Sequence, residues 1–374
     1  MKKAYLKQKI FTLAAVLIAV ILLLNFCYSI YDARGLAFYD GEKIAQIYPF
    51  YDRVYIVTEN GDGYVAGSNS QSSSQRYRSA GAHYSEALGM TCPVRFFKGE
   101  IAKMMPYSQG GAFFITAEGE LYGMYDFEVE KIADSAIHAA AAGLETIYFV
   151  DSDNKLWLCE EGKKTFLLEN VRSAEVYRGR VFVLGTNGEL CELMGTGELS
   201  APLFTGACAF SVHDTSLRFI DEHYVYDDAE GLATPLFNVL AEDGTLYAKG
   251  CYNLLSCGYG GITSPKPMPH YVREWTVIGE GVSSYSSSVM GTVMVFKNGK
   301  CAYYGFDTEM DLSSGFGYME LEAENVVSAY AGNLLVYVET AEDKRYAWGT
   351  DFNPLISERE VHNIFTGSAR ELGF

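Results

Sequence analysis

Two short runs of this sequence combine residue types that catalyse reactions or bind metals in other proteins. Ser152 and Lys155 have the Ser-x-x-Lys spacing of enzymes that acylate the serine, and Asp151 with Asp153 resembles the start of a calcium loop. The serine chemistry requires a helix that presents the lysine to the serine, and Lys155 stands where the calcium loop needs another oxygen ligand. Because Asn and Asp favour tight turns between strands, we interpret residues 151–155 as a hairpin turn.

The six histidines show no spacing typical of metal ligands, and the sequence contains no phosphate-binding glycine loop or Gly-x-Ser-x-Gly nucleophile turn. His213 precedes Asp214, and His223 follows Asp221 and Glu222, so an acid stands beside a base at two points. Exposed charged loops explain both runs without any chemistry. The sequence therefore predicts no catalytic residue, no metal site and no cofactor.

Four aromatic residues are the strongest candidates for a binding site. Each lies within three residues of a glycine that ends a predicted strand, and they are Tyr125, Tyr252, Phe306 and Phe352. Aromatic side chains give large rigid contact areas to protein partners, and their faces stack on sugars. If the strands belong to a ring, these residues lie on one rim and recognise a protein or a glycan there. The alternative is that they pack between neighbouring repeats.

The strands that position these residues belong to a motif that occurs seven times. Each copy has a run rich in Val, Ile, Phe and Tyr, a turn with Gly, Asn or Asp, and a second, alternating run that ends in aromatic residues. This pattern predicts a β-hairpin. The copies span residues 53–67, 111–124, 146–159, 180–193, 236–250, 292–305 and 334–349.

The seven hairpins predict a ring. A single hairpin is marginally stable in water, so the copies must bury their faces against one another. The turns are irregularly spaced, which disfavours a solenoid, whereas propeller blades accept loops of varied length. The predicted fold is therefore all-β, a seven-bladed β-propeller with roughly 49 residues per blade, and six or eight blades are the alternatives.

Two segments leave the blade assignment open. Residues 216–231 are either a degenerate eighth hairpin or, as we prefer, the outer strands of an enlarged blade. Residues 357–374 either close the ring with residues 36–39 or pack as a helix.

Residues 324–351, with the sequence ENVVSAYAGNLLVYVETAEDKRYAWGTD, resemble the repeat of the regulator of chromosome condensation family. That repeat has a Val-rich strand, a short Gly-containing link, a second strand, an acidic-Gly turn and then VYAWG before a polar residue. The same order appears in VRSAEVYRGRVFVLGTNGELCEL and in LFNVLAEDGTLYAKGCYN, and the resemblance covers most of residues 45–353. It implies a seven-bladed β-propeller in a divergent, bacterial, membrane-anchored member of the family.

This chain departs from the family pattern at two points. The link often contains a histidine, where this chain has Leu335 in one copy and Thr146 in another, and the Gly-Gln-Leu-Gly tail after the blade is absent. The founder of the family exchanges nucleotide on a nuclear GTPase and binds chromatin, and these functions do not carry over to an acidic, exterior chain. Secreted bacterial propellers of this type that bind proteins are the closer analogy.

Residues 10–30 carry no charge and, as a helix with a rise of about 1.5 Å per residue, can cross a hydrocarbon core of roughly 30 Å. Lysines precede this segment, and the whole chain has a net charge of −18. The sequence thus predicts a cytoplasmic tail (1–9), a transmembrane helix (10–30) and an extracellular propeller domain (31–374). A cleaved signal peptide and lipid attachment at Cys27 are the alternatives. The acidity argues against a nucleic-acid partner, because such partners are bound by basic residues.

The cysteines follow neither a disulfide framework nor a zinc spacing. Cys159, Cys191 and Cys301 occupy apolar positions of predicted strands and are interpreted as small buried side chains. Cys251 and Cys257 flank a loop and could pair with each other.

Together these features predict a membrane-anchored extracellular β-propeller that binds a protein or a glycan partner at the cell surface. An envelope scaffold or sensor subunit without a soluble ligand is the first alternative, and it would expose an apolar patch on the sides of the blades. A glycan-acting hydrolase or lyase is the less favoured alternative, and it would need facing carboxylates in the central cleft.

Overall fold

The computed structural model describes residues 42–50, 53–67, 84–85, 90–91, 93–108, 111–125, 128–142, 145–213, 235–254, 268–306, 316–332, 335–349 and 370–372. Every regular element within these ranges is a β-strand. The same ranges hold no helix of the length and hydrophobicity that a membrane crossing requires. The transmembrane helix expected over residues 10–30 lies outside the described residues.

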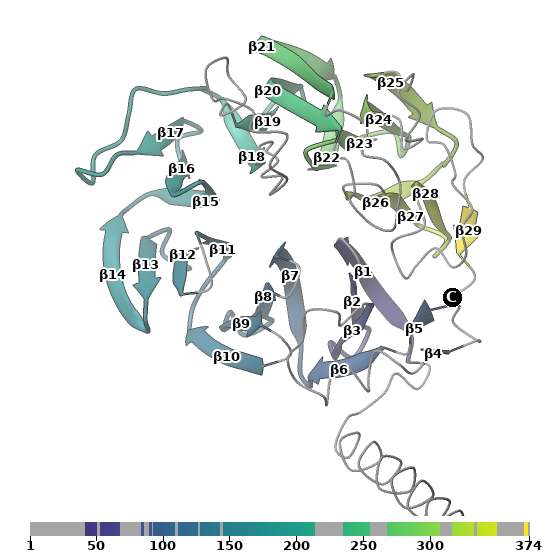
Figure 1. The fold of residues 1–374 in the computed structure, drawn as a ribbon, viewed down its shortest axis with the longest axis horizontal. Helices are drawn as coiled ribbons and strands as arrows, with labels where there is room; N and C mark the ends of the chain where they lie inside the picture. The colour runs from purple at the N-terminus through teal and green to yellow at the C-terminus, as the bar shows by residue number, and fades with distance from the viewer. Residues whose placement is uncertain are drawn as a thin grey trace, which may run out of the picture.

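Seven antiparallel sheets stand around one central axis, and successive sheets are built from successive stretches of the chain (Figure 1). We number these blades 1 to 7 in chain order. The strands of the first three blades are, for blade 1, β1 (Ile44–Phe50), β2 (Arg53–Thr58), β3 (Gly63–Gly67) and β6 (Val94–Phe97), for blade 2, β7 (Ile101–Ser108), β8 (Gly111–Thr116), β9 (Leu121–Tyr125) and β10 (Glu128–Ala133), and for blade 3, β11 (His138–Ala141), β12 (Thr146–Val150), β13 (Leu156–Glu160) and β14 (Lys163–Leu168).

Blade 4 has three strands, and blades 5 to 7 have four each. Their strands are, for blade 4, β15 (Val171–Tyr177), β16 (Arg180–Gly185) and β17 (Leu190–Leu193), for blade 5, β18 (Ala207–His213), β19 (Leu236–Ala241), β20 (Leu246–Leu254) and β21 (Met268–Gly279), for blade 6, β22 (Val282–Ser287), β23 (Gly291–Phe296), β24 (Cys301–Phe306) and β25 (Phe316–Leu321), and for blade 7, β26 (Val326–Ala331), β27 (Leu335–Thr340), β28 (Arg345–Gly349) and β29 (Arg370–Leu372). A separate two-stranded sheet joins β4 (Tyr84–Ser85) to β5 (Met90–Thr91).

The predicted seven-bladed β-propeller is confirmed, and each predicted hairpin forms the second and third strands of a blade. Residues 216–231 lie outside the described residues, in the connection between the first two strands of blade 5. The C-terminal run contributes β29, which pairs with β28 and so forms the outer strand of blade 7. The sequence suggested that this run either pairs with residues 36–39 or folds as a helix, and neither alternative is the pairing of β29 with β28.

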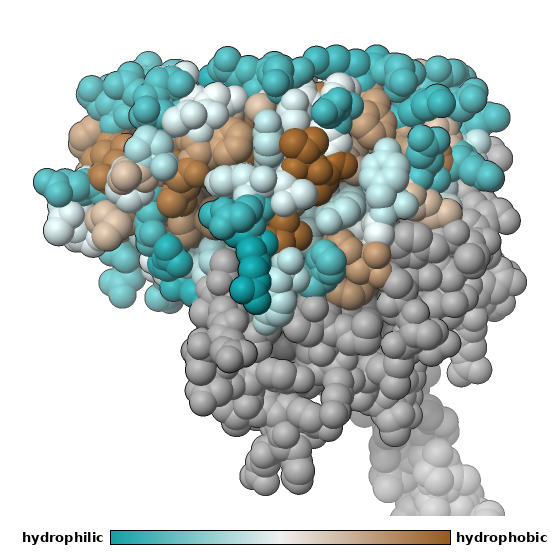
Figure 2. All heavy atoms as spheres, turned by 90° about the horizontal axis from the view of Figure 1, so that it is seen from above, coloured by the Kyte–Doolittle hydropathy of each residue, from teal (hydrophilic) through white to brown (hydrophobic). Residues whose placement is uncertain are grey.

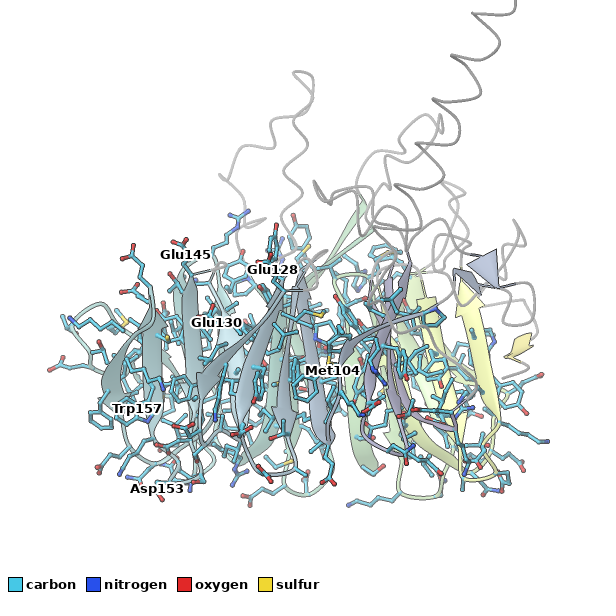
Figure 3. All side chains as sticks on the ribbon, turned by 90° about the horizontal axis from the view of Figure 1, so that it is seen from below. Met104, Glu128, Glu130, Glu145, Asp153 and Trp157 are labelled. Atoms are coloured by element: carbon cyan, nitrogen blue, oxygen red, sulfur yellow. The ribbon has the colours of Figure 1, made fainter. Side chains whose placement is uncertain are left out.

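The turns between the second and third strands share one backbone conformation. Each contains one residue with positive φ, and these residues are Gly61, Gly119, Asn154, Gly188, Gly244, Gly299 and Asp343. Figure 3 shows Asp153 in one such turn at one face of the ring, while Glu145, between the first two strands of blade 3, lies toward the opposite face. Gly, Asn and Asp tolerate positive φ, which is why these residue types marked the turns in the sequence.

These turns also connect the blades. In blades 1 to 6, the carbonyl of the positive-φ residue accepts a hydrogen bond from the N–H of a residue at or near the start of the next blade, as from Ile101 to Gly61 at 3.0 Å and from Val171 to Asn154 at 2.8 Å. A Cβ atom on Gly61 would lie 2.5 Å from the Glu100 Cα atom, so this close approach requires glycine. The repeated turn therefore sets both the hairpin and the position of the next blade.

The core consists of apolar clusters between successive blades. Both faces of a central strand are buried because the blades pack face to face. In β8, Ala112 and Phe114 pack toward blade 1, and Phe113 and Ile115 pack toward blade 3. This packing explains why the first run of each repeat, which forms the second strand of the blade, is continuously apolar instead of alternating.

Candidate functional site

The three described residues of the predicted aromatic rim, Tyr125, Tyr252 and Phe306, do not share an exposed rim. Tyr125, at the end of β9, is 47% exposed, whereas Tyr252 is 0% and Phe306 is 2% exposed in the core between blades 5 and 6. Phe352 lies outside the described residues. The described members of the set are therefore one surface residue and two core residues. The two core residues fit the alternative prediction, which was packing between neighbouring repeats.

The position of Tyr252 corrects the reading of Gly250 as the end of a strand. β20 continues to Leu254, and Gly250 has a φ of +124° at an irregularity in its pairing with β21. A Cβ atom on Gly250 would lie 2.1 Å from the Pro235 carbonyl oxygen, so this glycine permits a close backbone approach inside the sheet. Tyr252 consequently stays within the blade, where its hydroxyl bonds to Asn238 at 3.0 Å and to Thr292 at 3.1 Å.

The run at residues 151–155 is the predicted hairpin turn. The carboxylate of Asp151 accepts hydrogen bonds from the backbone N–H groups of Asp153 and Lys155, each at 2.9 Å, and from Trp157 Nε1 at 2.7 Å. Ser152 Oγ lies 2.7 Å from Ser135 Oγ. Asp151 thus caps the turn, and its oxygens are occupied by protein donors. Within the described part of the chain, no three His, Cys, Asp or Glu side chains are grouped as metal ligands would be.

Cys159, Cys191 and Cys301 are buried free thiols, as the apolar strand positions predicted. Cys251 is also a buried free thiol. Burial raises the pKa of Cys251 to about 11 and that of Cys301 to about 12, so neither thiol ionises readily at neutral pH. Cys257, the expected partner of Cys251, lies outside the described residues.

A cavity of about 360 Å³ lies in the central channel and is lined by strands of blades 2 to 7. Most of its lining comes from the innermost strands β7, β11, β15, β18, β22 and β26. The polar side chains in this lining are Tyr107, His138, Glu175, His213, Ser287, Ser288 and Tyr330. Ligand pockets of this size combine an apolar wall with a few convergent polar groups, and this cavity has that character.

The polar groups of the channel contact one another across the blades. His138 Nε2 lies 2.9 Å from the Ala174 carbonyl oxygen and 3.4 Å from Glu175 Oε1, which links blade 3 to blade 4. His213 Nε2 lies 2.8 Å from Ser287 Oγ, which links blade 5 to blade 6. The channel lining therefore contains two polar contacts between blades, one joining blades 3 and 4 and the other joining blades 5 and 6.

Glu175 is the single carboxylate among the described residues that line this cavity. The two facing carboxylates of a glycosidase are therefore not present in the described lining. His213 and Ser287 have the distance of a base and a nucleophile, but burial lowers the pKa of His213 to about 4, which makes it a weak base at neutral pH. The geometry supports recognition better than catalysis.

We expect the stability of the protein to depend on pH through His213. Its pKa is about 4 in the folded protein against an ordinary value of 6.5, mainly because burial disfavours the imidazolium, although the Glu175 carboxylate opposes this effect. The unfolded chain takes up the proton first, so this contribution is fully present above pH 6.5 and is lost as the pH falls toward 4. Urea unfolding should show a loss of up to about 3 kcal/mol over this interval.

His213→Gln is the matched variant for this measurement because it has no titrating ring. The difference in unfolding free energy between the native protein and His213→Gln should shrink as the pH falls from 6.5 to 4. A difference that stays constant over this interval would show that His213 is not buried as a neutral ring.

A second hollow, of about 1020 Å³, lies between blades 6 and 7 on the outside of the ring. Its lining includes Tyr318 and Tyr346, and its charged residues are Lys300, Glu320, Glu322, Glu324, Glu342 and Lys344. Two neighbouring blades form this groove, whereas strands from six blades converge on the channel cavity. The channel cavity is therefore the more enclosed of the two candidate sites.

The sequence drew attention to His213 only because Asp214 follows it. It gave no indication of His138, Glu175 or Ser287. These residues lie in different repeats and share no local motif, so no spacing rule connects them. Their common feature is a position on the first strand of a repeat, which faces the axis once the ring closes.

No family model matches this chain, and no curated protein matches it. Similar solved structures include Prp20p from Saccharomyces cerevisiae, 11% identical over 88% of this chain and 77% of that chain, with a TM-score of 0.43. BamB from Moraxella catarrhalis is 11% identical over 89% of this chain and 90% of that chain, with a TM-score of 0.43. The propeller domain of Cps50 (Swd1) from Myceliophteria thermophila is 8% identical over 84% of this chain and 100% of that chain, with a TM-score of 0.49.

All these TM-scores are below 0.5, so the fold of this chain rests on its own strand pairing, which defines a seven-bladed β-propeller. One of the similar structures contains yeast RCC1 (Prp20) bound to Kap60. Membership of the regulator of chromosome condensation family stays a prediction for this chain.

Proposed function

We propose that this protein is a membrane-anchored, extracellular binding platform that recognises a protein or glycan partner at the mouth of its central channel. The channel cavity carries this proposal, because it brings polar and aromatic side chains of successive blades to one enclosed place. The uncharged segment 10–30, the preceding lysines and the net charge of −18 support an anchored domain outside the cell.

A second candidate function, an envelope scaffold, is favoured by the outer wall of blades 4 and 5. Met194, Leu199 and Leu203 follow the last strand of blade 4 and are 46%, 47% and 39% exposed, and Val277 on β21 is 46% exposed. Figure 2 looks onto the outer wall of the ring, where brown apolar side chains stand among teal polar ones. Exposed apolar patches mark surfaces where proteins dock, and a scaffold would use such a wall.

The membrane anchor can be tested directly. We expect the full chain to sediment with cell membranes and to stay with them after alkaline carbonate extraction, because residues 10–30 would cross the bilayer. Protease added to intact cells should digest the propeller if it lies outside. A chain released by carbonate, or a propeller protected in intact cells and digested only after lysis, would contradict this topology.

The partner can be sought with the full chain in a non-ionic detergent. The chain is immobilised, and binding is measured to separated protein and glycan fractions of the parent cell envelope. Two variants localise the binding: Glu175→Gln changes the channel, and Leu199→Glu changes the outer wall. Saturable binding that Glu175→Gln weakens and Leu199→Glu leaves intact supports the channel platform. The opposite result supports the scaffold, and no saturable binding overturns the platform.

A further inference from the structure

We infer that the channel cavity selects a ligand that presents an ammonium or guanidinium group, which the carboxylate of Glu175 holds. This inference names the ligand chemistry of the proposed binding platform and therefore rests on that function. The ligand group is either a free amine or the end of a lysine or arginine side chain on a partner protein.

The first argument is that the Glu175 carboxylate can accept further hydrogen bonds in the cavity. A carbonyl oxygen only accepts, so the short contact at 2.9 Å means that His138 donates its Nε2–H to Ala174. Glu175 Oε1 lies 3.4 Å from the same nitrogen and accepts at most a weak second hydrogen bond from it. A carboxylate has about four acceptor sites, and the Glu175 side chain is 30% exposed to the channel. Glu175 therefore keeps accepting capacity for a ligand with several N–H donors.

The second argument is the aromatic wall. Tyr107 and Phe113 both line the cavity, and their rings stack with centroids 4.5 Å apart and planes inclined by 15°. Tyr330 lines the cavity as well. The face of an aromatic ring attracts a cation, most strongly where water is partly excluded. The cavity therefore combines one carboxylate with aromatic side chains in its lining, and both groups attract organic cations.

Lys103 is the charged group that opposes a cation in the channel. It lies on β7, two residues before Met105 of the cavity lining, and its ammonium donates a hydrogen bond to the Ile137 carbonyl oxygen at 3.3 Å. Lys103 is exposed to solvent by surface area, but the protein atoms around its ammonium partly desolvate it and lower its pKa, while the Glu175 carboxylate raises this pKa. The like charge weakens the binding of a ligand cation. Removing it should therefore strengthen binding.

The experiment titrates the full chain, in a non-ionic detergent at pH 7.5, with n-butylammonium and with its neutral isostere n-butanol. Binding is followed by ligand-observed NMR, which detects weak complexes. We expect n-butylammonium to bind and n-butanol not to bind. Glu175→Gln should weaken the ammonium complex roughly tenfold or more, because the amide oxygen still accepts a hydrogen bond but the carboxylate charge that strengthens it is lost. Lys103→Met should strengthen it several-fold.

Glu320→Gln is the matched control, because it removes the same charge from the groove between blades 6 and 7. It should leave the affinity unchanged, and thermal unfolding should confirm that all three variants are folded. Equal binding of n-butanol, or an affinity that Glu175→Gln leaves unchanged, would overturn the inference. An affinity that falls with Glu320→Gln instead would place the cation site in the outer groove and also overturn it.

A peptide with one central lysine, compared with the same peptide acetylated at that lysine, distinguishes the two sources of the cation. Tighter binding of the unmodified peptide than of n-butylammonium indicates a partner protein, and binding of n-butylammonium alone indicates a free amine. Envelope binding that persists in Glu175→Gln, without any ammonium binding, leaves the proposed platform intact and rejects the cation. Ammonium binding that depends on Glu175, without any envelope partner, supports the cation site and rejects the proposed platform.

Discussion

Replacing Arg345 with methionine is expected to lower the free energy of unfolding by about 3–5 kcal/mol. The side chains of Arg345 and Glu339 are 7% and 11% exposed, and Arg345 Nη2 lies 2.9 Å from Glu339 Oε1. The same Nη2 donates a hydrogen bond to the Ile44 carbonyl oxygen of blade 1 at 3.2 Å. The variant leaves a buried carboxylate without its cation and removes a contact between the first and last blades.

The surface pair Arg180 and Glu192 provides the matched control for this prediction. It is a close, two-bond ion pair on neighbouring strands, with Arg180 Nη2 2.6 Å from Glu192 Oε2, but the Arg180 side chain is 48% exposed. Solvent screens such a pair, so Arg180→Met should cost no more than about 1 kcal/mol. Urea unfolding of both variants gives the comparison. An equal cost for the two would show that the Arg345 pair is not buried in solution.

A double variant separates the lost charge pair from the lost contact between blades. Glu339→Met with Arg345→Met removes both charges, and apolar side chains of similar size often replace a buried ion pair at little cost. We expect the double variant to recover most of the stability lost in Arg345→Met. The part it does not recover measures the other contacts of Arg345, which include the hydrogen bond to Ile44.

Ring closure is the reason for this expected sensitivity. Blade 1 is built from residues 44–97, and blade 7 is built from β26 to β29, so each blade draws its described strands from its own stretch of the chain. Backbone hydrogen bonds from the repeated turns connect the successive blades. Between blades 7 and 1, Arg345 donates a buried hydrogen bond to the Ile44 carbonyl oxygen, and the exposed side chains of Lys43 and Asp343 form an ion pair. The loss of Arg345 therefore removes a buried polar contact where the ring closes, in addition to the charge partner of Glu339.

The hairpins could be predicted from the sequence because they depend on neighbouring residues. Asn154 and Gly244 adopt the positive φ that their residue types indicated, and the apolar runs on either side pair across the turn. The strands at the edges were harder to predict. β29 is three residues long and pairs with β28 from some distance along the chain, so no local pattern marks it.

The channel cluster could not be predicted because its residues meet only through the ring. His138 and Glu175 belong to neighbouring repeats, and each stands in a first strand whose sequence resembles an ordinary edge strand. The prediction that Tyr252 lies on an exposed rim was wrong for a related reason. A glycine after an aromatic strand signals either an end or a close approach, and only the packing of Gly250 against Pro235 decides between them.

Truncation of the two core aromatics is expected to destabilise the protein strongly. Tyr252→Ala and Phe306→Ala should each cost about 3–5 kcal/mol, because each leaves a cavity between blades 5 and 6. Tyr252→Ala also deprives Asn238 and Thr292 of the hydroxyl that bonds to both. Urea unfolding measures these costs.

Tyr125→Ala is the control for the same measurement, since its ring is 47% exposed and its loss should change the unfolding free energy by no more than about 0.5 kcal/mol. Both core rings pack against Phe316, with centroids 5.2 Å and 4.9 Å from it. Neighbours that share a partner do not act independently. The double variant should therefore cost less than the sum of the single variants. If neither substitution changed the unfolding free energy, Tyr252 and Phe306 would not be core residues, and they would again be candidates for partner binding.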